Sequence, residues 1–336
     1  MGIGKDKKCL LCAVLFLGIL FSGTDSRAAE KPSGQALETV RIAAFQGTIT
    51  ALLHVAEEKG FFERYGLKAS FSLYEAGITA LEDLVAGKLD IAAVIEYPFA
   101  IGRVKTDDLR IISSIASTNN VELIARTDRG ISRPSDCREK RIGVMRGTFG
   151  EFFLAVFLTF NGIRVADVKM VDLKPSEMED AMIRGAVDGV IIWQPFVHNI
   201  KQKMGDKVVS WPAQGSQDSY ALLVAKEPYI KSRPAVIERL LRALLDARDY
   251  TKQHTADAQE IIKKRFGYES PFLQLLWSQN RLEVQLTQDL LIIMEDEARW
   301  AMQNKVSQMR KMPNFFTHIY LDALKKIKPE AVTIIH

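Results

Sequence analysis

The chain has 336 residues, of which 47% are hydrophobic and 26% charged, so it is long enough for two domains of ordinary size and is too apolar to be disordered. Its 45 Lys and Arg residues against 41 Asp and Glu residues leave a net charge of +4. Because no basic face or stripe stands out, this balance gives no reason to expect nucleic acid as a partner.

The N-terminus has the three parts of a secretory signal peptide. A lysine-rich start precedes the apolar run 10–21, and Ala28 and Ala29 offer a site for cleavage. An uncleaved membrane anchor is the alternative, but it needs about 20 apolar residues. We therefore expect residues 1–29 to be removed on export and the protein to act in the periplasm.

From residue 40 the chain alternates short β-rich runs with longer amphipathic segments, which is typical of α/β folds. The segment that begins with Gln46, Gly47 and Thr48 predicts a helix through about Arg64, and Gly66 ends it. The first half is expected to contain strands at 40–45, 68–74, 90–95, 109–116 and 121–127, and helices at 48–64, at 79–86 and from Pro98 onward.

The same order of elements repeats from residue 141. The second half is expected to contain strands at 141–145, 168–173, 189–193, 208–212 and 220–225, and helices at 147–160, from Pro175 and from Pro195. Beyond Lys226 the chain becomes almost wholly helical. Helices are predicted there at 234–253, 256–266, 271–279 and 287–304, with one more amphipathic helix in the tail.

Two such halves predict two lobes with a cleft between them. The chain would cross between the lobes near 117–121 and 219–222, and these crossings would act as a hinge. We expect 38–118 and 224–336 to form the first lobe, including the C-terminal helices, and 119–223 to form the second. Ligands of open α/β sheets bind beyond the carboxyl ends of the strands.

Four stretches carry a resemblance to a known family: AEEKGFFERYGLKASF, ALEDLVAGKLDIAAVIEYP, KRIGVMRGTFGEFFL and AMIRGAVDGVIIWQPF. They resemble the solute-binding proteins of importers for nitrate, sulfonate, taurine and thiamine-precursor compounds. The resemblance implies an α/β, two-lobed periplasmic-binding-protein fold of the second structural type, with mostly parallel sheets flanked by helices and a helical C-terminal extension. It also implies a partner, an ABC permease with its ATPase in the inner membrane, which would receive the small-molecule solute.

The resemblance further implies that the turn at 46–48 forms one wall of the ligand site and the turn at 146–149 the facing wall. Each turn opens a helix, whose free N–H groups and positive dipole end attract anionic oxygens. Glu96 would receive an ammonium or amidine-like group, unless it only caps the helix that Pro98 begins. The predicted ligand-binding residues are Gln46, Gly47, Thr48, Glu96, Tyr97, Asn119, Arg146, Gly147, Thr148, Phe149 and Trp193.

Several of these residues could instead have a structural role. Trp193 either lines the cleft or packs in the core, and Arg146 either pairs with the ligand or is a solvated surface charge. Glu151 fits a capping-box partner of Thr148. Tyr97 and Phe149 either stack on the solute or pack the edge of a lobe. Asn119, Asn120 and Tyr220 are either ligand contacts or turn residues of the hinge, and His54 is predicted to be a packed core histidine.

An enzyme on the same fold is the rival function, as in pyrimidine-precursor and menaquinone-pathway relatives, and a periplasmic sensory module is a third. The five scattered histidines form no recognised metal or catalytic motif, and the chain has no phosphate-binding loop. Only Cys137 lies outside the leader, so no internal disulfide is expected. We therefore predict a monomeric binding protein without catalytic residues, metal or cofactor.

Overall fold

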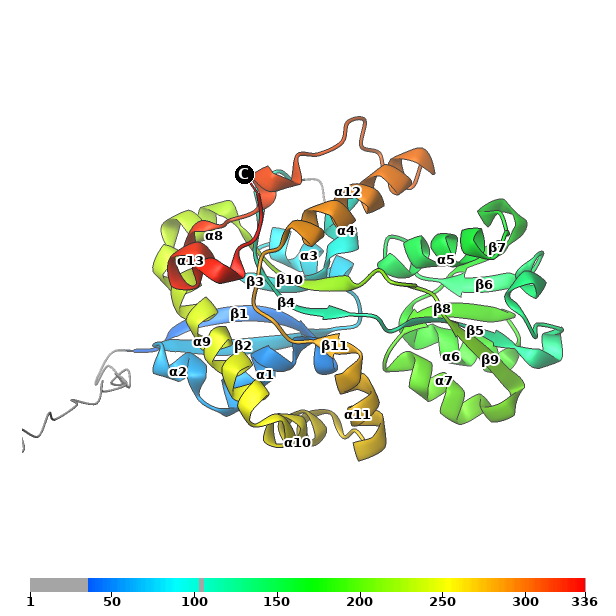
Figure 1. The fold of residues 1–336 in the computed structure, drawn as a ribbon, viewed down its shortest axis with the longest axis horizontal. Helices are drawn as coiled ribbons and strands as arrows, with labels where there is room; N and C mark the ends of the chain where they lie inside the picture. The colour runs from blue at the N-terminus through cyan, green and yellow to red at the C-terminus, as the bar shows by residue number, and fades with distance from the viewer. Residues whose placement is uncertain (1–35, 103–105, 336) are drawn as a thin grey trace, which may run out of the picture. The chain divides into compact units, whose positions relative to one another are not determined.

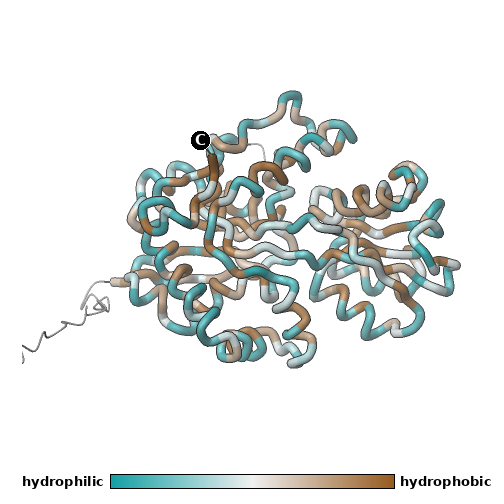
Figure 2. Tube along the Cα trace, in the orientation of Figure 1, coloured by the Kyte–Doolittle hydropathy of each residue, from teal (hydrophilic) through white to brown (hydrophobic). Residues whose placement is uncertain are grey.

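The computed structural model describes residues 36–102 and 106–335, so the predicted leader and its cleavage site lie outside the described residues. Two β-sheets, each flanked by helices, form the framework (Figure 1). Hydrophobic stretches run through both sheets, and the outward-facing parts of the helices are largely hydrophilic (Figure 2). Within the described ranges, no helix has the length and hydropathy that a membrane crossing requires.

The first lobe is the six-stranded sheet with the helices packed on it. Its strand order is β11-β4-β10-β3-β1-β2. β1 pairs in parallel with β2 and β3, whereas β10 pairs antiparallel with β3 and β4. The strands are β1 (Glu38–Phe45), β2 (Leu67–Tyr74), β3 (Ile91–Ile95), β4 (Leu109–Thr118), β10 (Ser219–Lys226) and β11 (Asn280–Arg281).

The second lobe is the five-stranded sheet with its helices. Its order is β7-β6-β8-β5-β9, and β6 pairs in parallel with β7 and β8, whereas β5 pairs antiparallel with β8 and β9. The strands are β5 (Val121–Arg126), β6 (Arg141–Val144), β7 (Lys169–Asp172), β8 (Gly189–Trp193) and β9 (Val208–Pro212).

The predicted α/β fold with two lobes is confirmed, but both sheets are mixed and not mostly parallel. The reason lies in the chain path. β4 leads out of the first lobe and β10 leads back into it, so these neighbours run in opposite directions. β5 and β9 enter and leave the second lobe in the same way.

The helices follow the predicted order with local differences. The helix predicted at 48–64 is a 3-10 turn followed by two α-helices, because Gly60 adopts a left-handed φ of 66° between them. The helices of the two halves are α1 (Ala51–Glu58), α2 (Phe61–Arg64), α3 (Gly77–Val85), α4 (Glu96–Ala100), α5 (Phe149–Phe160), α6 (Pro175–Arg184), α7 (Phe196–Met204) and α8 (Glu227–Ser232). The last of these and β11 were not predicted.

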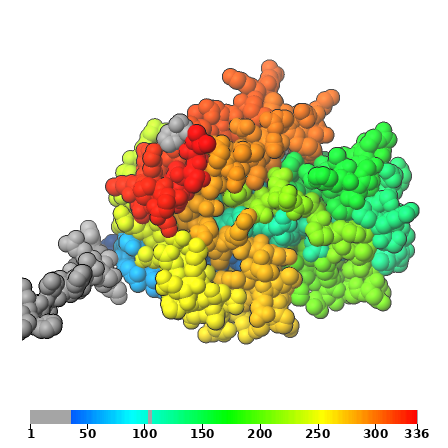
Figure 3. All heavy atoms as spheres, viewed as in Figure 1, coloured from blue at the N-terminus to red at the C-terminus, as the bar shows by residue number. Residues whose placement is uncertain are grey.

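The C-terminal helices pack mainly on the six-stranded sheet and its helices. α9 lies against α1 and α2, and its buried face includes Leu240, Leu241 and Leu244. In the space-filling view the C-terminal segments, coloured yellow to red, cover the first lobe (Figure 3). The helices are α9 (Pro234–Gln253), α10 (Thr255–Phe266), α11 (Ser270–Ser278), α12 (Gln288–Gln303) and α13 (Asp322–Ile327).

The two chain crossings are joined through one buried side chain, Gln214, which is 2% exposed. Its Oε1 accepts hydrogen bonds from the backbone N–H groups of Asn120 (2.7 Å) and Val121 (2.9 Å). Its Nε2 donates to the carbonyl oxygens of Thr118 (3.2 Å) and Gln217 (3.1 Å). The Gln214 amide therefore connects the outgoing crossing to the returning one, and the Asn119 amide adds a second link through the Gly215 carbonyl at 3.0 Å.

The first predicted crossing agrees with the gap between β4 and β5, but the second was wrong. Residues 219–222 lie inside β10, where Ser219 pairs with Thr118. The returning chain is already held in the sheet there, so it crosses before Ser219. The lobe boundaries 38–118, 224–336 and 119–223 stay a prediction.

Replacing Gln214 by Ala should lower the free energy of unfolding by about 2 kcal/mol or more, because two buried N–H groups lose their acceptor. Urea unfolding would measure the loss. Gln202→Ala, which removes an exposed amide from α7, is the matched control and should change stability by less than about 0.5 kcal/mol. Equal stability of the two variants would show that the amide does not hold the crossings together.

Candidate functional site

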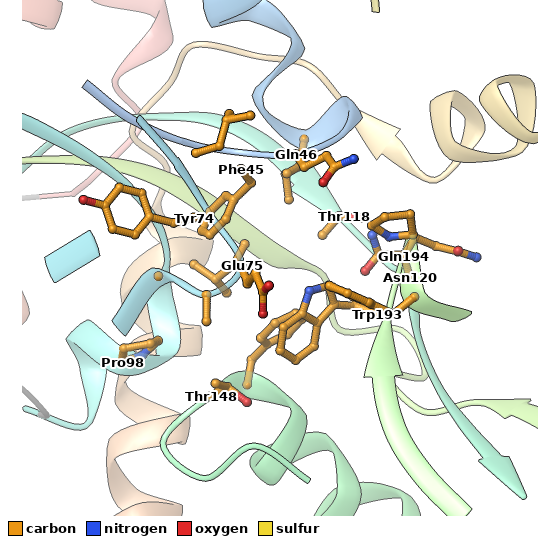
Figure 4. Close-up of a pocket in the computed structure, with 18 of the residues that line it drawn as sticks. Phe45, Gln46, Tyr74, Glu75, Pro98, Thr118, Asn120, Thr148, Trp193 and Gln194 are labelled. Atoms are coloured by element: carbon orange, nitrogen blue, oxygen red, sulfur yellow. The ribbon is translucent and has the colours of Figure 1, made fainter. Parts of the chain in front are cut away.

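A cavity of about 300 Å³ lies between the two lobes (Figure 4). From the first lobe it is lined by residues that follow β1 and β2, among them Gln46 and Glu75, and by Pro98 on α4. β1, β2 and β3 are parallel, so their carboxyl ends meet at one edge of the sheet. This edge forms the first wall.

The second wall comes from the start of α5 and the end of β8. The ring of Trp193 lies 4.8 Å from that of Phe149, centroid to centroid, at an interplanar angle of 36°. An aromatic surface thus faces the polar turn at Gln46 across the cavity.

Of the predicted ligand-binding residues, four line this cavity: Gln46, Thr148, Phe149 and Trp193. Trp193 is half-buried and lines the cavity, and its role as a ligand contact stays a prediction. The other predicted residues do not line it: Gly47, Thr48, Glu96, Tyr97, Asn119, Arg146 and Gly147. Most of these have another role in the structure.

Arg146 and Gly147 are engaged by a carboxylate of their own lobe. Glu151 is 3% exposed, and its Oε2 accepts from the Gly147 N–H at 2.9 Å. Its Oε1 lies 3.2 Å from the half-exposed Arg146 guanidinium. Glu151 therefore caps α5 as expected of a structural residue, although through Gly147 and not through Thr148. The Glu151 carboxylate therefore already compensates the positive N-terminal end of α5.

Glu96 lies in the core and not at the cavity. Its side chain is fully buried, and its Oε2 accepts from the Tyr220 N–H at 2.7 Å. The equally buried Glu297 of α12 is its neighbour. Burial raises the pKa of Glu96 to about 8 and that of Glu297 well above its ordinary value, so the pair holds protons at neutral pH. This corrects the prediction that Glu96 receives a ligand ammonium group.

Thr48 and Asn119 are used to join segments of the chain. The Thr48 hydroxyl accepts from the Asn280 side chain at 2.8 Å, and the Asn119 amide donates to the Gly215 carbonyl at 3.0 Å. His54 is a core histidine as predicted: it is fully buried, and burial lowers its pKa to about 3.

Aromatic side chains join the lobes on two sides of the cavity. Phe152 of α5 lies 5.5 Å from Trp300 of α12 and 6.0 Å from Tyr97 of α4, between ring centroids. On the other side, the ring of His198 on α7 stacks on Phe272 of α11 at 3.7 Å and 18°. The C-terminal helices α11 and α12 therefore contact both lobes.

Several residues that line the cavity were not predicted from the sequence. Ligands were expected beyond the carboxyl ends of the strands that precede Gln46 and Glu96, but this expectation was not extended to β2, which Glu75 follows. The same expectation would have found it. Further cavity residues that sequence reasoning did not consider for the ligand site include Ile49, Thr118, Phe196 and Asn199, whereas Asn120 was left open between a ligand contact and a hinge residue. Among the described residues, no group of His, Cys, Asp and Glu side chains could hold a metal ion.

The sequence matches the family described as NMT1/THI5 like over residues 48–258. A Bacillus subtilis (strain 168) protein named for binding aliphatic sulfonates is 27% identical over 262 residues, which are 76% of this chain and 77% of that one. The taurine-binding periplasmic protein of Escherichia coli (strain K12) is 25% identical over 246 residues, 72% of this chain and 71% of that one.

Solved structures share the fold at low identity. The alkanesulfonate-binding protein of Xanthomonas axonopodis pv. citri, bound to MOPS, has a TM-score of 0.74 at 15% identity and covers 85% of this chain and 99% of its own. A desulfurization enzyme has a TM-score of 0.59 at 14% identity, over 87% of this chain and 100% of its own. These likenesses show the fold alone.

The buried glutamate pair predicts that stability falls as pH rises. The folded chain keeps protons that the unfolded chain releases above its ordinary pKa of 4.5, so stability is fully present below that pH and is lost between about 4.5 and 8. The slope should reach about 1.4 kcal/mol per pH unit for each retained proton. Urea unfolding at pH 5, 6, 7 and 8 measures it.

Glu297→Gln should make this pH dependence shallower, because the neutral amide has no proton to release on unfolding, unlike the protonated Glu297 carboxyl group. Glu295→Gln changes an exposed carboxylate on the same helix and should leave the slope unchanged. A slope in Glu297→Gln equal to that of the wild-type protein would contradict the assignment.

Proposed function

Because the chain belongs to the NMT1/THI5-like family, we propose that it is the solute-binding component of an ABC importer, which captures a small polar solute between its lobes and delivers it to a membrane permease. The observation that carries the proposal is the cavity of about 300 Å³, whose walls come from strand ends of both lobes. A ligand there contacts two bodies that are connected by a hinge, and its binding therefore favours the closed arrangement.

The relatives support this proposal. The names of the Bacillus subtilis and Escherichia coli proteins refer to binding of sulfonates and of taurine, and the second is periplasmic. Together with the predicted leader they support a periplasmic protein that binds a small anionic or zwitterionic solute and hands it to a permease with its ATPase. We propose in addition that the protein acts as a monomer.

Hinge closure is the proposed mechanism. The lobes rotate about the crossings at 118–121 and 213–218, and Gln214 keeps these two segments together during the motion. Closure brings Phe272 against His198 and Phe152 against Trp300, and it removes water from the cavity. Polar contacts with the solute strengthen as water leaves.

An enzyme on this fold is the second candidate, because the desulfurization enzyme shares the arrangement of both lobes. A sensory binding module would use the same cavity and differ only in its membrane partner. Binding without turnover separates the enzyme from the proposed binding protein.

Thermal unfolding of the purified protein with taurine, alkanesulfonates, nitrate, aminopyrimidines, amino acids and polyamines tests the function. A solute at 100 times its dissociation constant should stabilise the protein by about 2.7 kcal/mol. Trp193→Ala should abolish the shift, since it removes the aromatic wall, whereas Phe160→Ala, at an 83% exposed position on α5, should keep it. Turnover of a solute that gives no stabilisation would favour the enzyme.

The contact between His198 and Phe272 should stabilise the closed form. Phe272→Ala is expected to weaken solute binding about twofold to tenfold, because stacked aromatic pairs contribute ~0.5–1.5 kcal/mol. It should also increase the radius of gyration of the liganded protein in small-angle X-ray scattering. Leu275→Ala, on the exposed face of α11, is the control. Unchanged affinity and scattering in Phe272→Ala would remove α11 from the closure mechanism.

A further inference from the structure

The cavity has a single charged side chain among the described residues that line it, and that side chain is the carboxylate of Glu75. Glu75 follows β2 directly, and Figure 4 shows its carboxylate pointing into the cavity. Within the described ranges, Glu75 forms no hydrogen bond or ion pair, whereas Asp83 accepts from the neighbouring Tyr74 hydroxyl and pairs with Lys88. The carboxylate is therefore free to pair with a ligand.

A bound solute changes the surroundings of this carboxylate. Glu75 is exposed in this structure, so water solvates it, but a carboxylate that loses its water to a solute without gaining a partner is costly. A nitrate or a simple sulfonate would bring a second negative charge beside it. A protonated nitrogen on the solute would instead neutralise Glu75 as water leaves.

The uncharged polar atoms of the cavity include several that can only accept hydrogen bonds. The Thr148 hydroxyl donates its proton to the Met145 carbonyl at 2.7 Å, and that of Thr118 donates to the Gln279 carbonyl at 3.3 Å. Their oxygens keep lone pairs for a ligand. Asn120 Oδ1 is buried and has no hydrogen-bond partner among the described residues. A solute that donates hydrogen bonds satisfies these atoms.

The two positively polarised groups at the start of α5 that the sequence pointed to are already engaged. The Gly147 N–H and the Arg146 guanidinium both contact Glu151, so the start of α5 carries little uncompensated positive charge. The charge balance of the cavity is therefore set by Glu75 and not by α5.

Aromatic rings complete the surroundings of the carboxylate. Phe45, Tyr74, Phe149 and Trp193 line the cavity. The Tyr74 hydroxyl donates to Asp83 at 2.7 Å, outside the lining, so this residue contributes its ring to the cavity. Aromatic rings also bind cations through their negative faces. The combination suits a flat or compact apolar body that bears a positively charged nitrogen.

The geometry points to a solute that carries a protonated amino or amidino group on a small apolar or aromatic body, with Glu75 as the residue that pairs with this group. The inference rests on the proposed binding function and narrows its solute class. It transfers to Glu75 the ammonium-binding role that the sequence suggested for Glu96.

Matched pairs of probes test the inference by calorimetry and thermal unfolding of the purified protein. Benzamidine is compared with neutral benzamide, and taurine with isethionate, in which a hydroxyl replaces the ammonium group. Methanesulfonate and nitrate serve as simple anions. Each probe is measured on the wild-type protein, on Glu75→Gln and on Glu82→Gln, which removes an exposed carboxylate from α3 outside the cavity.

We expect benzamidine to bind wild-type protein and Glu82→Gln at least about tenfold more tightly than benzamide, and Glu75→Gln to lose this preference. Taurine should bind more tightly than isethionate to the wild-type protein and to Glu82→Gln. Unfolding of each variant without a probe establishes that Glu75→Gln is folded.

Three results would overturn the inference in different ways. Binding of methanesulfonate, isethionate or nitrate without binding of benzamidine or taurine would reject the solute class and leave the binding function intact. Equal binding of the amine-bearing probe by Glu75→Gln would reject Glu75 as its partner. Failure of every cationic, zwitterionic and anionic probe would reject the proposed function together with the inference.

Discussion

The structure depends on the two segments through which the chain passes from one sheet to the other and back, because these segments hold the two lobes together. The side-chain amide of Gln214 links the two segments. It accepts hydrogen bonds from two N–H groups of the outgoing crossing and donates to carbonyl groups on both crossings. A buried amide can do this because it offers both a donor and an acceptor. The adjacent short strand β11 pairs with the end of β4, so the C-terminal region supports the same point. These contacts define the pair of segments about which we propose that the lobes rotate.

Buried carboxyl groups also determine which charged side chain is left at the cavity. Glu151 turns inward to the Gly147 N–H and takes up the positive end of α5. Glu96 and Glu297 keep their protons in the core and contribute no negative charge at neutral pH. Glu151 is paired within its lobe, and Glu96 and Glu297 are protonated in the core. Glu75 is therefore left as the charged group of the cavity lining within the described ranges. The electrostatic character of the site follows from capping and burial elsewhere in the fold.

Sequence patterns predicted most of the fold because they report local properties. The helix at 234–253 and the strand at 189–193 have the predicted bounds, since apolar periodicity and flanking Pro or Gly mark such elements. The returning crossing was misplaced because Ser219 joins its strand through pairing with Thr118, a contact between residues far apart in the chain that no local pattern reveals. Gln46 and Trp193 were found from strand ends, whereas the burial of Glu96 depends on α12, which lies in the C-terminal part of the chain.

The contrast between Glu96 and Glu75 shows what family resemblance conveys and what it omits. Both residues follow parallel strands of one sheet, so strand order alone gives them equal access to the cleft. They differ because α12 covers the residue after β3, whereas the residue after β2 stays exposed at the cavity. The scaffold common to the family therefore fixes where a ligand can lie. The packing of the C-terminal helices decides which of the two acids lines the cavity, and with it the sign of the charge that we propose the cavity selects.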